Sequence, residues 1–307
     1  MNIFNNLKNY DNKIPCVAAL GNFDGVHIGH KELLKLVCKE AKSNGLKSLA
    51  VTFDKHPANY LTGRNVSPFI TDNEQKARLI SEIGIENIMF LPFNDEISNL
   101  SPEDFVKIYL KEKLNVKIAV CGFHYGFGKG GAGTAHDLIE LCKKYDIKVI
   151  VLPPVLSDNV IASSSYIRNL LQLGDMETAA HFLGRNFCVN LTVVVGKRIG
   201  RKMGIPTINQ DFLENSIVPS YGVYATYTYI ENEKNPSVTN IGVRPTINNF
   251  SKENMETHII GKRIYLYSQK VKVEFIKKIR DEIRFSNITS LKKQIENDIN
   301  KVLEITK

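Results

Sequence analysis

The sequence predicts an α/β domain, with helices on both faces of a parallel sheet, followed by a small antiparallel β-barrel domain with a C-terminal helix. Apolar strands alternate with amphipathic helices through the first half of the chain, which is the pattern of repeated βα units. After Gly184, apolar and polar residues alternate with a period of two, as in antiparallel strands. We therefore expect two domains, residues 1–184 and residues 185–307.

Short apolar runs in the first half have the composition of buried parallel strands. These runs are Val17–Leu20, Ser48–Phe53, Asn87–Phe93, Ile118–Cys121 and Lys148–Leu152. Helices are predicted between them at Lys31–Asn44, from near Asp72, after Ser101 and from Thr134. Thr71 and Glu74 have the spacing of a capping box, and Pro102 suits the first position of a helix.

The second half contains three stretches typical of strands, rich in β-branched and aromatic residues. They are Val189–Val195, Val223–Ile230 and Val271–Phe275, with Gly, Pro and Asn between them. Apolar residues at helical spacing from Ile288 to Val302 then predict a closing amphipathic helix.

Composition favours a soluble, cytoplasmic protein. No apolar run approaches the roughly 18 residues that a membrane span needs, and Met1–Lys13 is polar, unlike a signal peptide. The cysteines are odd in number and form no C-x-x-C pair, so we expect buried thiols in a reducing compartment. The net charge of +8 is spread along the chain, which fits small polyanionic substrates and gives no reason to expect nucleic acid or membrane partners.

The most informative segment is Leu20–His30, which reads Leu-Gly-Asn-Phe-Asp-Gly-Val-His-Ile-Gly-His. It joins the first predicted strand to the first predicted helix, whose N-terminal amides attract phosphate. His27 and His30 fall on one face of the opening turn. This pattern favours a site for the α-phosphate of a nucleoside triphosphate. Zinc ligands or incidental polar residues are the alternatives, but no further Cys or His cluster completes a zinc site.

A second segment, Ser163–Arg168, supplies hydroxyl groups at a helix start and an arginine one turn later. These groups suit the β- and γ-phosphates that leave as pyrophosphate. The simpler interpretation of three serines before a helix is an N-cap.

In the second half, residues 196–209 combine glycines and basic residues with Thr207 and Asn209. The spacing does not match the P-loop pattern, and such a loop is often only a hairpin. Backbone amides and cations nevertheless suit phosphate, and Thr207 and Asn209 offer hard oxygen ligands for Mg²⁺.

Leu20–His30 resembles the G-x-F-D-G-x-H-x-G-H signature of the nucleotidyltransferase superfamily. Together with Thr52–Pro57 and Gly122–Gly128, it is similar to the FMN adenylyltransferase module of bacterial bifunctional riboflavin kinase/FAD synthetases. The resemblance implies a Rossmann-like domain in which FMN attacks the α-phosphate of Mg-ATP, with His27 and His30 as catalytic residues. It implies ATP or phosphate contacts by Gly21, Asn22, Phe23, Asp24, Gly29, Ser164 and Arg168, and FMN contacts by His56, Pro57, His124 and Phe127.

Residues 196–209 resemble the G-x-x-x-G-R-x-x-G-x-P-T-x-N loop of riboflavin kinases, and further family segments follow in order to the end of the chain. The resemblance implies that Glu256 is the general base for the riboflavin 5′-hydroxyl. It implies Mg²⁺ binding by Thr207 and Asn209. It also implies ATP contacts by Gly196, Gly200, Gly204, Pro206, Thr207 and Asn209, and flavin contacts by Tyr224, Arg244, Arg280 and Phe285.

Two departures from the family pattern bear on function. His124 stands where the family usually has Asn or Asp, and Gly261–Ser268 replaces an acidic turn with a basic and apolar one. The leading expectation is an enzyme that uses ATP to convert riboflavin to FMN and FMN to FAD, products that flavin-dependent apoproteins would accept. The alternatives are a monofunctional FAD synthetase with a degenerate kinase domain, a different nucleotidyltransferase, and a basic RNA- or flavin-binding regulator.

Overall fold

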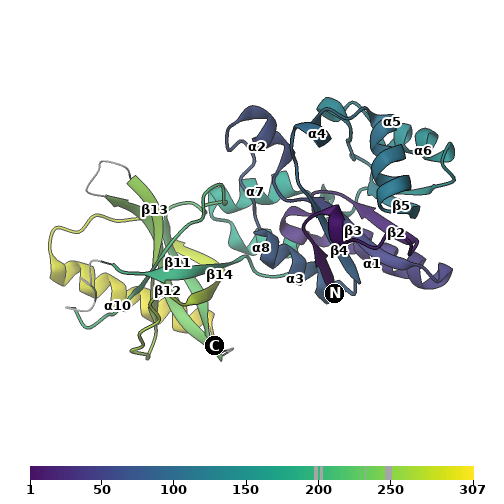
Figure 1. The fold of residues 1–307 in the computed structure, drawn as a ribbon. Coiled ribbons are helices and arrows are strands. Elements are labelled where there is room, and N and C mark those ends of the chain that lie inside the picture. Colours follow the sequence, from purple (N-terminus) through teal and green to yellow (C-terminus); the bar gives the residue numbers. More distant parts are fainter. Residues whose placement is uncertain (197–199, 201–202, 232, 246–250) are drawn as a thin grey trace. The chain divides into compact units, whose positions relative to one another are not determined.

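The computed structural model describes the chain except residues 197–199, 201–202, 232 and 246–250. The chain forms two compact units, Met1–Ser164 and Ser165–Lys307 (Figure 1). This division comes earlier in the chain than the expected boundary after Gly184. Helices α7 (Ser164–Leu173) and α8 (Met176–Leu183) therefore fall almost entirely in the second unit.

The first unit is built on a six-stranded sheet in the order β1-β4-β3-β2-β5-β6, and every neighbouring pair is parallel. The strands are β1 (Asn2–Phe4), β2 (Cys16–Leu20), β3 (Lys47–Phe53), β4 (Asn87–Leu91), β5 (Val116–Gly122) and β6 (Lys148–Leu152). The predicted parallel sheet is therefore confirmed, and only the three-residue strand β1 was not predicted.

Helices cover both faces of this sheet, as predicted. The larger elements are α1 (Ile28–Asn44), α3 (Asn73–Ile83), the π-helical segment η3 (Phe105–Lys113) and α6 (Ala135–Lys143). On β2, Val17 and Ala19 pack in the core that α1 and α3 complete, whereas Ala18 and Leu20 face the core of η3 and α6. Short elements connect these parts: η1 (Leu7–Asn9), η2 (Asp24–Val26), α2 (Pro57–Thr62), α4 (Asp95–Ser98), α5 (Pro102–Asp104), η4 (Lys129–Gly131), β7 (Leu156–Ser157) and β8 (Val160–Ile161).

The strand order sets where a ligand can bind. The chain leaves β2 toward β3 and β4 on one side and returns to β5 on the other. In open α/β sheets, ligands bind beyond the carboxyl ends of strands at such a change of direction. The β2–α1 turn and the loop after β5 both lie at this point.

Helix caps follow the predicted signals with one exception. Ser101 caps α5, and Thr134 forms a capping box with Asp137 at the start of α6. The predicted capping box between Thr71 and Glu74 is wrong, because Asp72 caps α3 by accepting a hydrogen bond from the amide of Gln75 at 2.7 Å.

The second unit is a closed antiparallel barrel in the order β10-β13-β12-β11-β14-β9. The strands are β9 (Cys188–Val194), β10 (Ile208–Asp211), β11 (Gly222–Ile230), β12 (Glu233–Pro245), β13 (Ser251–Ile259) and β14 (Lys270–Arg280). Helix α10 (Ile288–Ile305) packs on the outside of the barrel (Figure 1). Its Val302 belongs to the same buried cluster as Val223 and Ala225. Because side chains alternate along a strand, Tyr224 and Thr226 of β11 face the interior.

An ion pair fastens α10 to the barrel. Arg280 at the end of β14 donates to both carboxylate oxygens of Asp298, at 2.7–3.1 Å, and Gln294 donates to the same carboxylate. Asp298 is only 1% exposed. Within the described residues, no helix is long and apolar enough to cross a membrane.

Candidate active sites

The β2–α1 turn has an unusual backbone. Phe23, Gly25 and Val26 adopt positive φ angles of 48°, 77° and 40°. Non-glycine residues in this region are costly and persist where the surrounding structure enforces them, which is common at functional sites. Here the turn brings the predicted residues from Gly21 to His30 together at the carboxyl edge of the sheet.

His27 is the N-cap of α1. Its Nδ1 accepts a hydrogen bond from the backbone amide of His30 at 3.4 Å, and its side chain is 5% exposed. A neutral imidazole that accepts at Nδ1 carries its proton on Nε2, which can donate. A Cβ on Gly29 would lie 3.1 Å from Cε1 of His27, so a side chain at this position would press on the ring.

His30 stacks on His27 with ring centroids 3.6 Å apart, and the ring of Phe23 meets it edge-on. Burial lowers the pKa of His30 well below its usual value, and the neighbouring His27 and Lys76 lower it further. Its Nδ1 is buried and has no hydrogen-bond partner in the part of the chain that the structure describes. A neutral imidazole with an unused polar atom is suited to receive a ligand.

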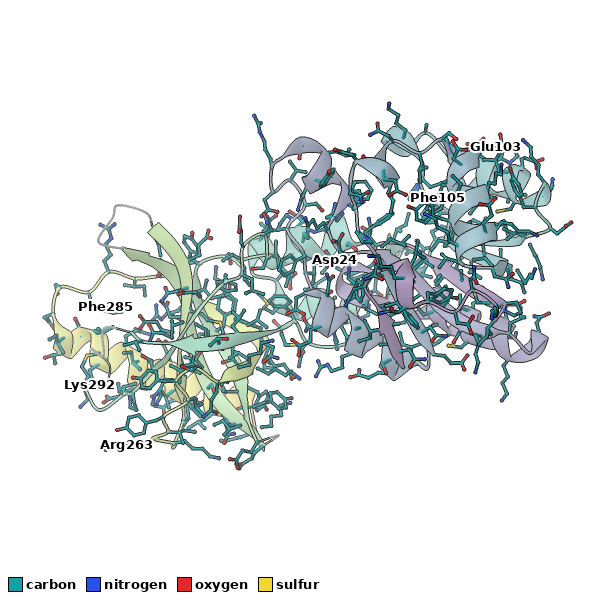
Figure 2. The ribbon with its side chains drawn as sticks, viewed as in Figure 1. Asp24, Glu103, Phe105, Arg263, Phe285 and Lys292 are labelled. Carbon is teal, nitrogen blue, oxygen red and sulfur yellow. The ribbon has the colours of Figure 1, made fainter. Side chains whose placement is uncertain are left out.

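Asp24 serves the architecture of this site (Figure 2). Its buried carboxylate accepts hydrogen bonds from the amides of Ile70 and Thr71, at 2.9–3.1 Å. Thr71 completes the clamp by accepting from the amide of Gly25 at 3.1 Å. The surroundings of Asp24 thus favour a structural role over the predicted contact with ATP.

Ser164 lies at the same turn, since its hydroxyl donates to the carbonyl of Asp24 at 2.9 Å. Asn22 is exposed, and its carbonyl accepts a hydrogen bond from Thr52 at 3.0 Å. Arg168 is buried in the second unit, so its contact with the triphosphate stays a prediction.

The four predicted FMN contacts differ in accessibility. His124 is exposed, and its ring is tilted against the ring of Phe123 with centroids 3.8 Å apart. Phe127 is buried beside the rings of Phe105 and Tyr125. His56 caps α2, where Pro57 is the first helical residue, and the His56 ring also bonds to Ser67 at 3.3 Å. His56 and Phe127 therefore shape the loops, and contact with FMN remains a prediction for all four residues.

The second candidate site lies on the outer surface of the barrel. Asn209 of β10 stands directly opposite Glu256 of β13, so their side chains project from the same face. Glu256 is exposed, whereas Asn209 is 5% exposed and its Oδ1 has no partner among the described residues. Thr207 lies just before β10, two residues ahead of Asn209, and lines the pocket described below.

The loop before β10 passes closely over Asn209. A Cβ on Gly196 would lie 2.5 Å from Nδ2 of Asn209. The carbonyl of Gly200 accepts hydrogen bonds from the amides of Met203 and Ile205, and Gly204 has a φ of 82° that suits glycine. Nδ1 of His258 then donates to the carbonyl of Pro206 at 2.8 Å. In the described part of this loop, Gly196 thus allows the close approach to Asn209, and Gly204 allows the positive φ.

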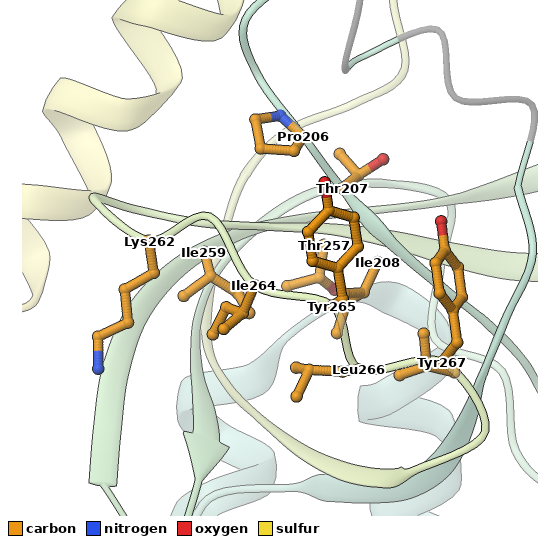
Figure 3. Close-up of a pocket in the computed structure, with 11 residues that line it drawn as sticks. Pro206, Thr207, Ile208, Thr257, Ile259, Lys262, Ile264, Tyr265, Leu266 and Tyr267 are labelled. Carbon is orange, nitrogen blue, oxygen red and sulfur yellow. The ribbon is translucent and has the colours of Figure 1, made fainter.

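A pocket opens beside Thr207, lined by Val193, Pro206, Thr207, Ile208, Thr257, Ile259, Lys262, Ile264, Tyr265, Leu266 and Tyr267 (Figure 3). One wall is the stretch Ile264–Tyr267, part of the segment that departs from the family pattern. Its aromatic and aliphatic side chains suit a planar apolar group next to a phosphate.

The predicted flavin contacts on the barrel are less accessible. Tyr224 is fully buried inside the barrel, and its hydroxyl donates to the carbonyl of Ser220 at 2.5 Å. The Arg280 guanidinium donates hydrogen bonds to Asp298, and its Cζ lies 6.0 Å from the centroid of the Phe285 ring. These contacts favour structural roles for Tyr224 and Arg280. The Arg244 side chain lies outside the described residues.

Sequence reasoning missed two buried polar groups near the sites. Asn254 precedes Glu256 by two residues and shares its strand face, and its buried Nδ2 has no partner among the described residues. Lys76 lies on α3 and is 7% exposed. The two-residue spacing to Glu256 could have identified Asn254, whereas no motif marks Lys76.

Comparisons with known proteins agree with this two-site layout. The FAD synthetase family matches residues 9–166, and the riboflavin kinase family matches residues 183–306. The bifunctional riboflavin kinase/FMN adenylyltransferases of Buchnera aphidicola subsp. Schizaphis graminum and Bacillus subtilis are each 36% identical to this chain. The alignments span 92% of the chain and 91% and 90% of those proteins.

The chain belongs to the bifunctional riboflavin kinase/FMN adenylyltransferase family. The Escherichia coli K12 member is 31% identical over 92% of this chain and 90% of its own length. A crystal structure described as a macrolide-efflux protein from Streptococcus pneumoniae has the same fold, with a TM-score of 0.87, 30% identity and 97% of each chain covered. Both family halves are present in order, which supports the bifunctional interpretation over the monofunctional alternative.

Proposed function

We propose that this protein makes FMN from riboflavin and ATP at the barrel site, and FAD from FMN and ATP at the β2–α1 turn. The observation that carries the proposal is the presence of two separate sites, each suited to one step. The His27–His30 pair at a helix start suits adenylyl transfer, and the Asn209–Glu256 pair suits phosphorylation of a hydroxyl group.

In the adenylyl step, an FMN phosphate oxygen attacks the α-phosphorus of ATP while the bond to the bridging oxygen of pyrophosphate breaks. No covalent enzyme intermediate is needed, so the protein contributes positioning and charge stabilisation. Nε2–H of His27 and backbone amides in the first turn of α1 would donate to the α-phosphate oxygens. His30, kept neutral by burial, would take part through hydrogen bonds without adding a charge.

In the kinase step, Glu256 would accept the proton of the riboflavin 5′-hydroxyl as that oxygen attacks the γ-phosphorus of ATP. The bond from the γ-phosphorus to its bridging oxygen breaks at the same time, and ADP leaves with that electron pair. Asn254 offers a buried donor on the same strand face, which suits a ribityl hydroxyl. The pocket beside Thr207 would hold the adenine, because its wall combines aromatic and aliphatic side chains.

Mg²⁺ fits the barrel site. Oδ1 of Asn209, which has no hydrogen-bond partner among the residues that the structure describes, and the Thr207 hydroxyl are oxygen ligands of the kind that this ion prefers. Mg²⁺ usually completes its shell with water and substrate phosphates. When bound there, Mg²⁺ would neutralise charge on the transferring phosphoryl group. The products would then serve flavin-dependent apoproteins.

Two substitutions test the assignment of one activity to each site. His27→Ala should lower FAD formation from FMN by at least about 100-fold while FMN formation from riboflavin continues. Glu256→Ala should abolish FMN formation while FAD formation from supplied FMN continues. Each variant controls for the fold of the other, and loss of both activities in either folded variant would refute the assignment.

A further inference from the structure

Lys76 is a buried cation without a direct partner. Its side chain is 7% exposed, and no hydrogen bond or ion pair engages its ammonium group within the described part of the chain. Its Nζ lies over the Phe90 ring, 5.9 Å from the ring centroid. Burying an unpaired ammonium is expensive, so such a group usually has a ligand or a function.

The position of Lys76 places this ammonium at the adenylyl site. Lys76 lies in the first turns of α3, which begins at the carboxyl edge of the sheet, and helical side chains lean toward the helix N-terminus. The clamp between Asp24 and Thr71 ties the residues just before α3 to the β2–α1 turn. The ammonium lies close enough to His30 for its charge to lower the pKa of that imidazole.

Nearby carboxylates do not explain the cation. Asp24, Asp54 and Asp72 are near enough to raise the pKa of Lys76, although burial lowers it overall. Each of them is already bonded to backbone amides: Asp24 to residues 70 and 71, Asp54 to residue 93, and Asp72 to residue 75. None of the three lies within the 4.0 Å of an ion pair with Lys76 in the described residues. The three carboxylates therefore reduce the free-energy cost of burying the charged ammonium, and they leave it able to contact a ligand.

We propose that Lys76 is a further catalytic residue of adenylyl transfer, whose ammonium contacts a phosphate oxygen of the reacting substrates next to His30. This inference rests on the proposed function of the β2–α1 turn. As the FMN oxygen bonds to the α-phosphorus, the electron pair of the broken bond leaves on pyrophosphate. A preorganised cation stabilises that developing charge more than the charge of the bound substrates.

The test compares Lys76→Met, which keeps the apolar stem and removes the charge, with Lys76→Arg, which keeps the charge. The full chain is assayed with Mg-ATP for FAD formation from FMN, and FMN formation from riboflavin serves as the control on the second unit. We expect Lys76→Met to lower kcat/KM for FAD formation at least about 100-fold, with the kinase unchanged. Partial rescue is expected in Lys76→Arg.

Thermal unfolding separates catalysis from structure. If the ammonium only supported the fold, Lys76→Met would lower Tm and leave the kcat of the folded fraction near wild type, which would overturn the proposal. We expect an unchanged or higher Tm, because an unpaired buried charge is removed. Should Lys76→Met not fold, Lys76→Gln is assayed in the same way, and failure of both to fold would assign the ammonium to the fold and also overturn the proposal.

Titrations with ATP alone and FMN alone identify the phosphate. Weaker ATP binding in Lys76→Met places the contact on the triphosphate, weaker FMN binding places it on the FMN phosphate, and a loss in kcat alone places it in the transition state. Equal FAD formation in wild type and variant refutes the role of Lys76. Absence of FAD formation in the wild type would instead refute the proposed function itself.

Discussion

Gly196→Ala probes how closely Gly196 must approach Asn209, the metal ligand proposed for the barrel site. The new Cβ would lie 2.5 Å from Nδ2, 2.6 Å from Cγ and 2.7 Å from Oδ1 of Asn209. Carbon contacts in proteins are about 3.5–4.0 Å, so the loop and the amide must separate by roughly 1 Å. Asn209 is buried and cannot swing aside without losing the position of its Oδ1.

A misplacement of about 1 Å at a reacting centre costs about 100-fold in rate, and overpacking a buried site costs about 1–3 kcal/mol of stability. We therefore expect Gly196→Ala to lower kcat/KM for FMN formation about 100-fold. FAD formation from supplied FMN, measured chromatographically in the same preparation, should be unchanged because the first unit is untouched.

A double-mutant cycle adds a structural control. In an Asn209→Ala background the clash is absent, so Gly196→Ala should then lower the free energy of unfolding by much less than it does alone. Wild-type kinase activity in folded Gly196→Ala, or equal destabilisation in both backgrounds, would refute the argument that this glycine seats Asn209.

Three further predictions concern the histidine pair and the barrel helix. Folding lowers the pKa of His30, so the folded protein keeps this imidazole neutral at a pH where the unfolded chain protonates it. The free energy of unfolding should therefore fall by at most about 1.4 kcal/mol per pH unit as the pH drops below the unfolded pKa of about 6.5. Urea unfolding from pH 8 to 5 should show this fall in wild type and a smaller fall in His30→Gln. Asp298→Ala leaves Arg280 without its buried partner and should cost about 3–5 kcal/mol, seen as a lower Tm with FAD formation kept at low temperature; an unchanged Tm would contradict the anchoring role. Gly29→Ala should press on the His27 ring and lower FAD formation about tenfold with the kinase unaffected, and equal rates would show that the ring has room to move.

Much of the fold followed from hydrophobic periodicity. Strands β2 to β6 and the main helices of the first unit were predicted because continuous apolar runs and capping residues are local signals. Strand β1 was missed because a segment of three residues is too short to show an alternation of apolar and polar side chains. The grouping of α7 and α8 with the barrel depends on packing between distant segments, which a composition shift at Gly184 does not reveal.

The site was predictable where residues follow one another in a motif. His27, His30 and Gly29 lie in one turn, so the sequence placed them together, and Thr207 and Asn209 were found because they close one loop motif. The function of Asp24 and Thr71 was not predictable, since their hydrogen bonds join residues 46 and 47 positions apart. For the same reason Thr71 was assigned to a helix cap, although its hydroxyl binds Asp24 and Gly25. Lys76 is distinguished only by burial, which depends on the complete fold.

The most direct measurement is a time course of the purified protein with Mg-ATP and either riboflavin or FMN, with the flavins resolved by chromatography. Two working sites predict FAD from both substrates, with FMN appearing before FAD in the riboflavin reaction. FAD from FMN alone would contradict the kinase assignment and direct attention to the pocket wall at Ile264–Tyr267 and the neighbouring Lys262. No turnover of either flavin would contradict both assignments.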